Sequence, residues 1–208
     1  PLKIDEILEM RPTIDQVDIK GQAILFQSGI YGIIPDDMPE GLALSALDVA
    51  GAPAQAAKLV QSGQKVLVIG GGGKSGMLCM YEAKKRAGVT GKVICIAGSP
   101  KSEARAKNLD LADVYMVADA TNAVEVYNAI MEVTDGKLCD VVINCVLWPK
   151  TRKDHLIYRE DLKLMKPGAM IIDVACDDEG AVETCHSTCH EDPVYYEEGI
   201  LHYAVDNI

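Results

Sequence analysis

The hydrophobic positions of the chain fall into short, wholly apolar runs that alternate with helical patterns from Lys65 onward. Runs that are apolar throughout are typical of strands buried on both faces of a parallel sheet. They predict strands at 66–69, 93–97, 114–117, 141–146, 170–175 and 201–205. The amphipathic patterns between them predict helices at 74–87, 101–109, 122–133 and 159–165.

This alternation predicts an α/β fold with a doubly wound, mostly parallel sheet of the Rossmann type. Ligands of such sheets bind at the carboxyl ends of the strands, where the strand order reverses. Gly88 directly follows the helix predicted at 74–87, and we expect it to end that helix in the left-handed conformation. Candidate binding residues are therefore sought in the loops that follow the strands.

The first 60 residues follow a different pattern. Residues 4–8 form a short amphipathic stretch, and residues 23–26 resemble a strand. Apolar residues then recur at helical spacing over 40–60, with a glycine and a proline as interruptions. We therefore expect 1–60 to be a partial N-terminal segment of a second domain with a linking helix, and 61–208 to be the dinucleotide-binding domain.

Composition narrows the range of partners. The 208 residues are 49% apolar and 25% charged, without a run of the ~20 apolar residues that a membrane-spanning helix needs. The net charge of −11, from 20 basic and 31 acidic residues, disfavours nucleic acid or an anionic membrane as partner, because both carry charge of the same sign. The chain begins at Pro1 and stops directly after a predicted strand, so we expect a fragment of a longer protein.

The cysteines favour a reducing compartment. Four of the seven, Cys79, Cys95, Cys145 and Cys176, fall inside apolar helix or strand patterns, where cysteine is usually a small buried hydrophobe. The start of the chain does not have the pattern of a secretory signal. We therefore expect reduced thiols and a cytoplasmic protein.

A cluster of potential zinc ligands lies near the end of the sequence. It consists of Cys176, Cys185, His186, Cys189 and His190. Their spacing does not match the C-x2-4-C pattern of zinc knuckles and ribbons, and no histidine is paired with an orienting carboxylate as in catalytic zinc sites. We therefore predict no metal site. The carboxylates from Asp173 to Glu183 follow a strand end, where they belong either to an active-site loop or to an ordinary turn.

The strongest chemical signal is the glycine-rich turn after the strand predicted at 66–69. In a Rossmann domain, glycines there permit a tight turn, a close approach of the backbone to a pyrophosphate, and packing of the next helix on the sheet. Two spacings fit, GxGxxxG from Gly70 and GxGxxG from Gly71. The residues expected to bind the cofactor here are Gly70, Gly72, Gly73, Lys74, Ser75 and Gly76. We expect valine at position 72 to abolish dinucleotide binding and to leave the fold intact.

Two other interpretations of this turn remain. A P-loop, GxxxxGK[ST], is disfavoured because its four-residue interval between glycines is absent before Lys74 and Ser75, and ATP or GTP hydrolysis is disfavoured with it. The second alternative is a glycine-rich turn between a strand and a helix that binds no ligand.

The end of the second predicted strand bears on the choice between NAD and NADP. NAD-specific domains have an acidic residue there that receives the ribose hydroxyls. No acidic residue occurs between Glu82 and Glu103, whereas Ser99, Lys101 and Arg105 supply a hydroxyl and two cations that suit a 2′-phosphate. We therefore keep NAD and NADP as cofactors and favour NADP. The alternative is that the two cations only solvate a helix end.

Beyond these motifs, residues 21–146 resemble the L-erythro-3,5-diaminohexanoate dehydrogenases of lysine fermentation. The stretches that carry this resemblance are 22–26, 47–55 and 66–79. Residues 147–208 resemble the nucleotide domain of the alanine dehydrogenase group, especially N5-(carboxyethyl)ornithine synthase. They do so at 148–149, 154–161, 165–168, 172–175, 183–184, 192–194 and 202–207. The change of resemblance at residue 147 fits two explanations. The chain is either a single divergent protein or a chain joined from two pieces.

Both resemblances imply an NAD(P)-dependent oxidoreductase that acts on the CH–NH2 or CH–NH group of a small amino-acid substrate, as a dehydrogenase or in a reductive condensation. They also imply cofactor contacts at strand ends, namely Ser99, Asn144, Cys145, Val146, Val205 and Asn207. We expect the protein to be a homo-oligomer. A non-catalytic module that senses NAD(P) is the alternative, because the sequence has no recognisable catalytic pair.

The catalytic residues stay unassigned. In the alanine dehydrogenase group, the lysine and histidine that handle the substrate lie on a separate N-terminal domain, and residues 1–60 contain no motif that matches it. His155 and His202 are the candidates for proton transfer within the chain. His202 lies inside a predicted strand, which favours a structural role, and His155 is expected in a solvated loop.

Overall fold

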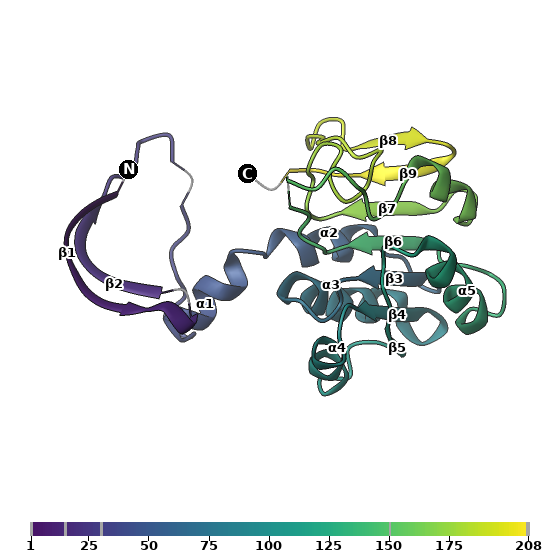
Figure 1. The fold of residues 1–208 in the computed structure, drawn as a ribbon, viewed down its shortest axis with the longest axis horizontal. Helices are drawn as coiled ribbons and strands as arrows, with labels where there is room; N and C mark the ends of the chain where they lie inside the picture. Colours follow the sequence, from purple (N-terminus) through teal and green to yellow (C-terminus); the bar gives the residue numbers. More distant parts are fainter. Residues whose placement is uncertain (1, 15, 30, 150, 207–208) are drawn as a thin grey trace. The chain divides into compact units, whose positions relative to one another are not determined.

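The computed structural model describes residues 2–14, 16–29, 31–149 and 151–206 (Figure 1). The chain divides into two units, Pro1–Leu44 and Ser45–Ile208, and helix α1 (Glu40–Leu47) crosses the boundary between them. Every strand predicted from residue 66 onward lies in the second unit. Within the described ranges, no helix is long and apolar enough to cross a membrane.

The second unit is built around a seven-stranded sheet. Its strands, in spatial order, are β5 (Val114–Val117), β4 (Lys92–Ala97), β3 (Lys65–Ile69), β6 (Val141–Asn144), β7 (Met170–Asp173), β9 (Ile200–Tyr203) and β8 (Val194–Glu197). All neighbouring pairs are parallel except β9 and β8. The chain runs outward from β3 to β5 and then returns to β6 on the other side of β3. This order confirms the doubly wound, mostly parallel Rossmann-type sheet, with its reversal between β3 and β6.

Helices pack against this sheet (Figure 1). They are α2 (Gly51–Leu59), α3 (Lys74–Ala87), α4 (Pro100–Lys107), α5 (Ala123–Val133) and the 3-10 helix η3 (Arg159–Leu164). The helix predicted at 159–165 is the 3-10 helix η3, and Pro167 accounts for its end because proline disfavours a helical conformation in the residue before it. The helical pattern over 40–60 divides into α1 and α2, since residues 48–50 form a turn.

Helix α3 begins and ends at the predicted residues. Its N-cap is Gly73, in an extended conformation (φ −84°, ψ 170°), and three basic residues, 84–86, occupy its last turn. Cations there interact favourably with the negative end of the helix dipole. Gly88 has the predicted positive φ of 65°, but its ψ of −168° is extended. Gly88 therefore ends the helix without forming the left-handed cap that the sequence predicts.

The sheet separates two apolar clusters. Val66 and Val68 of β3 pack in one cluster with residues of α2 and α3, including Met80. Leu67 and Ile69 point to the opposite face and pack with residues of α5 and η3. Both faces of β3 are therefore buried, as its uninterrupted apolar run predicts.

Two strands end earlier than the apolar pattern predicts. β6 ends at Asn144 and β7 at Asp173, whereas the predicted strands continue to residues 146 and 175. The N–H of Val146 donates to the Asn144 side chain, and the N–H of Ala175 donates to the Asp173 side chain. Because these N–H groups bond to side chains, the loops leave the sheet at that point.

The other side of the sheet also differs in detail from the prediction. The strand predicted at 201–205 is β9, which runs from Ile200 to Tyr203. The sequence pattern did not indicate β8, which pairs antiparallel with β9 at the sheet edge. Alternate residues of β8 are exposed, so it lacks the continuous apolar run of the central strands.

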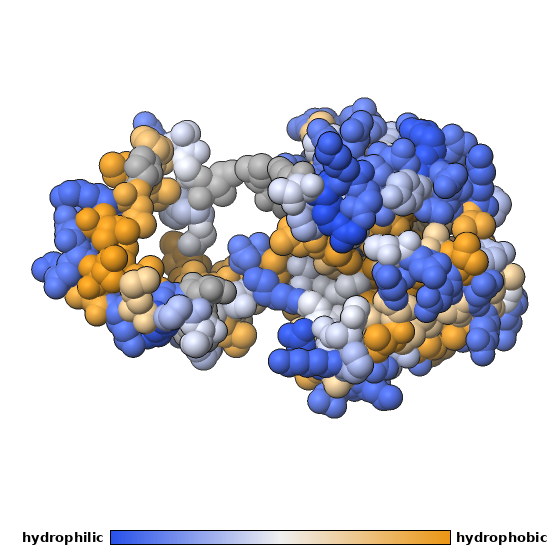
Figure 2. Space-filling view, viewed as in Figure 1, coloured by the Kyte–Doolittle hydropathy of each residue, from blue (hydrophilic) through white to orange (hydrophobic). Residues whose placement is uncertain are grey.

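The first unit contains an antiparallel hairpin of β1 (Leu2–Arg11) and β2 (Gln16–Ala23). The amphipathic stretch 4–8 lies in β1. The strand predicted at 23–26 is wrong, because Ala23 pairs with Leu2 and the described residues offer no partner strand beyond that pair. Most side chains of the hairpin are exposed, and Figure 2 shows apolar residues on its surface.

Candidate functional site

The glycine-rich turn joins β3 to α3 beside the reversal of strand order (Figure 1). The N–H groups of Gly70 and Gly71 both donate to the Ile96 carbonyl at 3.0 Å, and the N–H of Gly73 donates to the Gly70 carbonyl at 3.0 Å. Gly70 has a φ of +79°, a conformation that favours glycine. Gly70 therefore makes the tight turn, and the end of β4 anchors it.

Two further glycines lie too close to neighbouring backbone for a side chain. A Cβ atom at Gly76 would lie under 3.0 Å from the Gly70 carbonyl oxygen, so α3 packs directly on the turn. A Cβ atom at Gly72 would lie under 3.0 Å from the carbonyl oxygen of Ser102 in the first turn of α4. The expectation that valine at position 72 leaves the fold intact is therefore wrong, because Gly72 is buried against α4.

Gly73 is placed differently from these glycines. It is exposed, and the nearest atom to an added Cβ would be the Gly70 carbonyl oxygen at 3.3 Å. As the N-cap of α3 it supplies no side chain, and the first helical bond runs from the Met77 N–H to the Gly73 carbonyl. The first N–H groups of a helix have no partner within the helix, and the positive end of its dipole favours an anion there. The start of α3, at Lys74 and Ser75, is therefore suited to a phosphate.

Lys74 also carries a cationic side chain. Its Nζ atom lies 2.9 Å from Asp48 Oδ2, in the turn between α1 and α2. Both side chains are largely exposed, so this pair adds little to stability. The ammonium group is held near the start of α3 by a contact that solvent weakens.

Two hollows open along the carboxyl ends of the strands. The first hollow lies on the β5 side, between the loops after β3, β4 and β5. Its lining includes Gly70, Gly98, Asp119, Thr121 and Val146. Hydrogen bonds from the hydroxyl and N–H of Thr121 lower the pKa of Asp119 below its ordinary value. Asp119 is thus an anion in a loop that the sequence analysis did not select.

Ser99, at the carboxyl end of β4, caps helix α4. Its Oγ accepts a hydrogen bond from the Ser102 N–H at 3.3 Å. Arg105 Nη2 donates to the Ser102 hydroxyl at 3.3 Å. The structure therefore brings Ser99 and Arg105 together around Ser102, and Lys101 is exposed beside them. The sequence analysis missed Ser102, although a hydroxyl three residues after an N-cap serine was an available signal.

The second hollow lies on the β7 side of the reversal. It is lined by Asp48, Val49, Gly51, Ala52, Ser75, Cys145, Val146, Leu147, Val174, Ala175 and Asp206. Cys145 and Val146 thus reach a cavity, as expected of cofactor contacts. Asn144 does not line either hollow, because its side chain is fully buried and donates to Asp173 Oδ1 at 2.9 Å. Burial raises the pKa of the Asp173 carboxyl, and the hydrogen bond from Asn144 opposes that shift.

Val205 follows β9 by two residues and directly precedes Asp206, which lines the second hollow. Its carbonyl accepts hydrogen bonds from Gln55 Nε2 at 3.1 Å and from Cys176 Sγ at 3.3 Å. Gln55, which the sequence pattern did not single out, therefore joins α2 to the segment after β9, 150 residues away. Asn207, the remaining expected contact, lies outside the described residues.

Neither candidate histidine lines a hollow of the site. His202 is buried between the Thr184 hydroxyl, 2.8 Å from Nε2, and the Ile200 carbonyl, 3.1 Å from Nδ1. Burial lowers its pKa, which keeps the ring neutral and confirms the structural role. His155 is half-buried, and its Nδ1 lies 2.8 Å from the Gly180 carbonyl.

Several of the thiols, among them Cys95, Cys145 and Cys176, have raised pKa values and little chemical reactivity. Burial raises the pKa of Cys95 to about 11 and that of Cys176 to about 12. The neighbouring Cys79 thiol and burial raise the pKa of Cys145. Thiols with raised pKa values stay protonated at neutral pH and are poor nucleophiles and metal ligands. Within the part of the chain that the structure describes, no group of three or more His, Cys, Asp and Glu side chains is placed to hold a metal ion.

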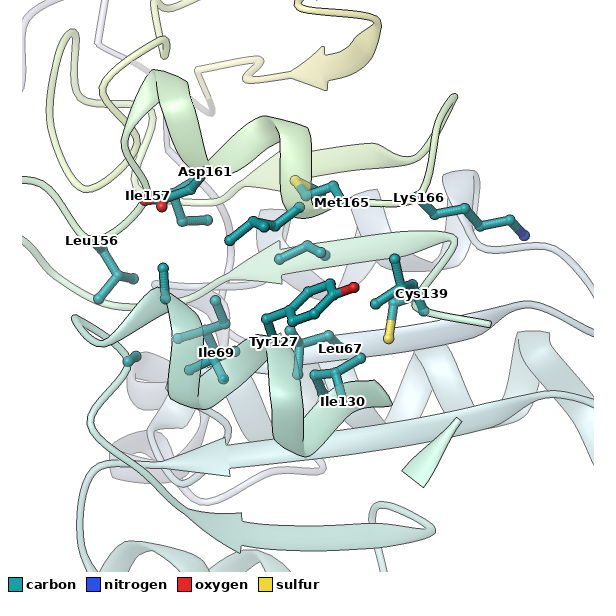
Figure 3. A pocket seen from close by; sticks show the side chains of 16 residues that line it. Leu67, Ile69, Tyr127, Ile130, Cys139, Leu156, Ile157, Asp161, Met165 and Lys166 are labelled. Atoms are coloured by element: carbon teal, nitrogen blue, oxygen red, sulfur yellow. The ribbon is translucent and has the colours of Figure 1, made fainter. Parts of the chain in front are cut away.

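A third hollow lies between α5 and η3 and is mostly apolar (Figure 3). Leu67 and Ile69 of β3 line it together with Tyr127 and Ile130 of α5, and Met165 lies across from them. None of the residues expected to bind a cofactor lines this hollow. We assign it no part in the candidate site.

Comparison with known proteins extends this description. The family model described as alanine dehydrogenase/PNT, C-terminal domain, matches residues 50–208. The matched range runs without a break across residue 147, where the two sequence resemblances meet. One family description therefore covers both segments of the chain.

The curated relatives confirm both resemblances. The chain is 53% identical over 157 residues to the L-erythro-3,5-diaminohexanoate dehydrogenases of Fusobacterium nucleatum and Acetoanaerobium sticklandii, covering 76% of this chain and 46% of each relative. It is 34% identical over 145 residues to alanine dehydrogenase 1 of Staphylococcus aureus, covering 70% of this chain and 36% of the relative. The chain thus spans about half the length, or less, of the curated relatives it matches.

Solved structures agree with the fold. An L-alanine dehydrogenase matches with a TM-score of 0.54 and 29% identity, over 79% of this chain and 45% of that chain. A transhydrogenase from Sinorhizobium meliloti matches with a TM-score of 0.56 and 21% identity, over 77% and 47%. The second likeness concerns the fold alone.

The packing of Gly72 leads to a stability prediction. Alanine at position 72 is expected to reduce the free energy of unfolding by about 1–3 kcal/mol, because its methyl group overpacks the contact with Ser102. Gly98→Ala is the matched control, since an added Cβ there meets nothing within 4 Å. Urea unfolding of the two variants measures the difference. Equal stability of both variants would contradict the close contact at Gly72.

Proposed function

The chain belongs to the family of alanine dehydrogenase/PNT C-terminal domains, and from this premise we propose that it is the dinucleotide-binding part of an NAD(P)-dependent amino-acid dehydrogenase. The observation that carries the proposal is the glycine turn, which opens a helix N-terminus beside the reversal of strand order. Relatives named L-erythro-3,5-diaminohexanoate dehydrogenase favour oxidation at a CH–NH2 group of a small diamino acid. Bound nicotinamide supplies the hydride acceptor, and the protein sets its orientation.

The turn fits a pyrophosphate in two respects. Gly73 is exposed and has no side chain at the start of α3, so the backbone N–H groups there are open to an anion. Lys74 carries the nearest cation, and its exposed pair with Asp48 is weak enough to give way to a phosphate. We propose that the first-turn N–H groups of α3 hold the pyrophosphate and that Lys74 adds charge.

We assign the two nucleoside halves of the dinucleotide to the two hollows, one half to each. A Rossmann sheet holds a dinucleotide across two mononucleotide-binding halves, with the adenosine ribose at the end of the second strand. We assign the adenosine half to the first hollow, which Gly70 and Gly98 line. Ser99 directly follows Gly98, and it meets Arg105 around Ser102 at the start of α4. We assign the nicotinamide half to the second hollow, which Cys145 and Ala175 line.

We propose no acid or base within the chain. His202 is neutral, buried and occupied by two hydrogen bonds, and His155 is occupied by the Gly180 carbonyl. This observation favours a second candidate function, a non-catalytic module that senses NAD(P). Both candidates require dinucleotide binding, and only the first requires turnover.

Turnover separates these two candidates. The longer protein to which we expect this chain to belong is incubated with NAD+ or NADP+ and with 3,5-diaminohexanoate or alanine, and reduced nicotinamide is followed by its absorbance. We expect reduction with at least one amino acid, at a higher rate with the diamino acid. Calorimetry with NADH and NADPH runs in parallel. Binding without turnover would favour the sensing module, and absence of binding would contradict both candidates.

The exposed N-cap allows cofactor binding to be separated from folding. Gly73→Asp is expected to preserve or slightly raise stability, because aspartate is a favourable N-cap and interacts well with the helix dipole. The same carboxylate is expected to weaken dinucleotide binding by tenfold or more, roughly the effect of 1.4 kcal/mol, since it occupies the anion position. Gly73→Asn is the neutral control and is expected to bind more tightly than the aspartate variant. Equal affinity of the two variants in calorimetry would exclude a pyrophosphate at this helix.

The residues at the start of α4 lead to a prediction about the choice between NAD and NADP. We expect NADP(H) to bind at least as tightly as NAD(H), because hydrogen bonds from charged groups to a 2′-phosphate contribute about 1.5–3 kcal/mol. Ser99→Asp keeps an N-cap on α4 and is expected to reverse the preference, whereas Ser99→Asn, which keeps the cap without the charge, is not. The NADP advantage should shrink as salt screens the contact. A clear preference for NAD that Lys101→Ala and Arg105→Ala leave unchanged would show that these cations only solvate the helix.

A further inference from the structure

A buried polar pair joins the carboxyl ends of β6 and β7. Asn144 and Asp173 are register partners in these parallel strands, and their side chains are 0% and 2% exposed. Asn144 Nδ2 donates to Asp173 Oδ1 at 2.9 Å. The pair thus extends the ladder between the two strands by one bond between side chains.

Each member of the pair also holds the loop that follows its own strand. The N–H of Val146 donates to Asn144 Oδ1, and the N–H of Ala175 donates to Asp173 Oδ1, both at 3.2 Å. The N–H of Val174 crosses between the strands to the Asn144 carbonyl at 3.0 Å. Val146, Val174 and Ala175 all line the second hollow. The pair therefore holds residues that line the hollow in place, while its own side chains do not line it.

Cys176 extends this arrangement to β9. Its backbone has a φ of +52°, a conformation that non-glycine residues rarely adopt. Its thiol donates to the Asp173 carbonyl at 2.9 Å and to the Val205 carbonyl at 3.3 Å. A strained backbone of this kind persists only where its surroundings impose it, and such sites cluster where ligands bind.

Sheet stability alone does not account for the pair. Asp173 Oδ2 is buried and meets no hydrogen-bond donor in good geometry among the described residues, and the Cys185 thiol is a further polar group that interacts with this carboxyl. A buried carboxyl with an unused oxygen carries a desolvation cost, and two apolar residues of similar volume are often as stabilising or more so. The neighbouring pairs of the same two strands, such as Ile143 with Ile172, are apolar. The polar pair occurs only at the register position next to the second hollow.

We propose that Asn144 and Asp173 are positioning residues that hold the nicotinamide half of the dinucleotide site in its binding shape. The inference rests on the proposed function, because it assigns the second hollow to the nicotinamide. The pair does not touch the cofactor. It acts through Val146 and Ala175, whose N–H groups it holds.

The test compares two ligands that differ at the nicotinamide end. NADH and ADP-ribose share the adenosine and pyrophosphate, and only NADH carries the nicotinamide ring. The variant Asn144→Asp places a second carboxylate against Asp173 in the buried pair, where like charges repel. We expect it to weaken NADH binding about tenfold in calorimetry. ADP-ribose binding is expected to change less than about twofold. The double variant Asn144→Asp/Asp173→Asn restores one amide and one carboxylate in exchanged positions. It is expected to recover the NADH affinity of the unmodified chain.

Asn144→Ala is measured beside the charged variant, because it removes the amide without adding a carboxylate. Thermal unfolding reports whether each variant folds, and the alanine variant carries the same expectation if the aspartate variant does not fold. Equal losses for NADH and ADP-ribose, no loss for either, or failure of the exchanged pair to recover would overturn the inference. An unmodified chain that binds neither ligand would instead overturn the proposed function. An unmodified chain that binds ADP-ribose and NADH equally would show that the nicotinamide ring makes no contact for the pair to position, which also overturns the inference.

Discussion

Close contact between backbone segments at the glycine turn determines how the domain is arranged. Side chains do not fit at Gly71, Gly72 or Gly76, because an added Cβ would lie under 3.0 Å from the Cys95 sulfur or from the backbone of neighbouring segments. Each contact joins the turn to a different element, β4 at Gly71, α4 at Gly72 and α3 at Gly76. The starts of α3 and α4 are consequently brought to the same edge of the sheet. Two helix N-termini at one edge create a region of positive potential from backbone groups alone.

This backbone potential matters because the side chains of the protein are predominantly acidic. A net charge of −11 repels an anionic dinucleotide at long range, and salt at about 0.15 M screens that repulsion beyond roughly 8 Å. Within that distance, fixed N–H groups act on a phosphate without the entropy cost of ordering long side chains. Lys74 is already paired with Asp48, so at the proposed pyrophosphate site we expect the backbone groups to supply the main attraction and Lys74 to add to it. The acidic composition therefore disfavours polyanionic partners and is still compatible with a small anionic ligand.

The sequence was sufficient to predict features that depend on local patterns. Predominantly apolar runs identified the six strands of the parallel part of the sheet, and a glycine run between a strand and a helix identified the turn. The sequence did not predict features that depend on contacts between residues far apart along the chain. The contact between Gln55 and Val205 spans 150 residues, and the contact that makes Gly72 necessary comes from the backbone of Ser102, whose position no residue type reveals. The hairpin of β1 and β2 was missed for the same reason, since strand pairing over 2–23 depends on register rather than on composition.

The errors at the strand ends have a physical cause that also points to the site. The apolar runs continue past Asn144 and Asp173 because the residues after them, such as Val146 and Val174, are apolar. In the structure those apolar residues line the second hollow and leave the ladder, since the two polar side chains bond to the N–H groups of Val146 and Ala175. A polar pair inside an otherwise apolar core is a local conflict of the kind that natural sequences retain at functional sites. The position where hydrophobic periodicity fails to predict the end of a strand is therefore the position where the sheet gives way to the wall of the second hollow, which we propose as the nicotinamide half of the site.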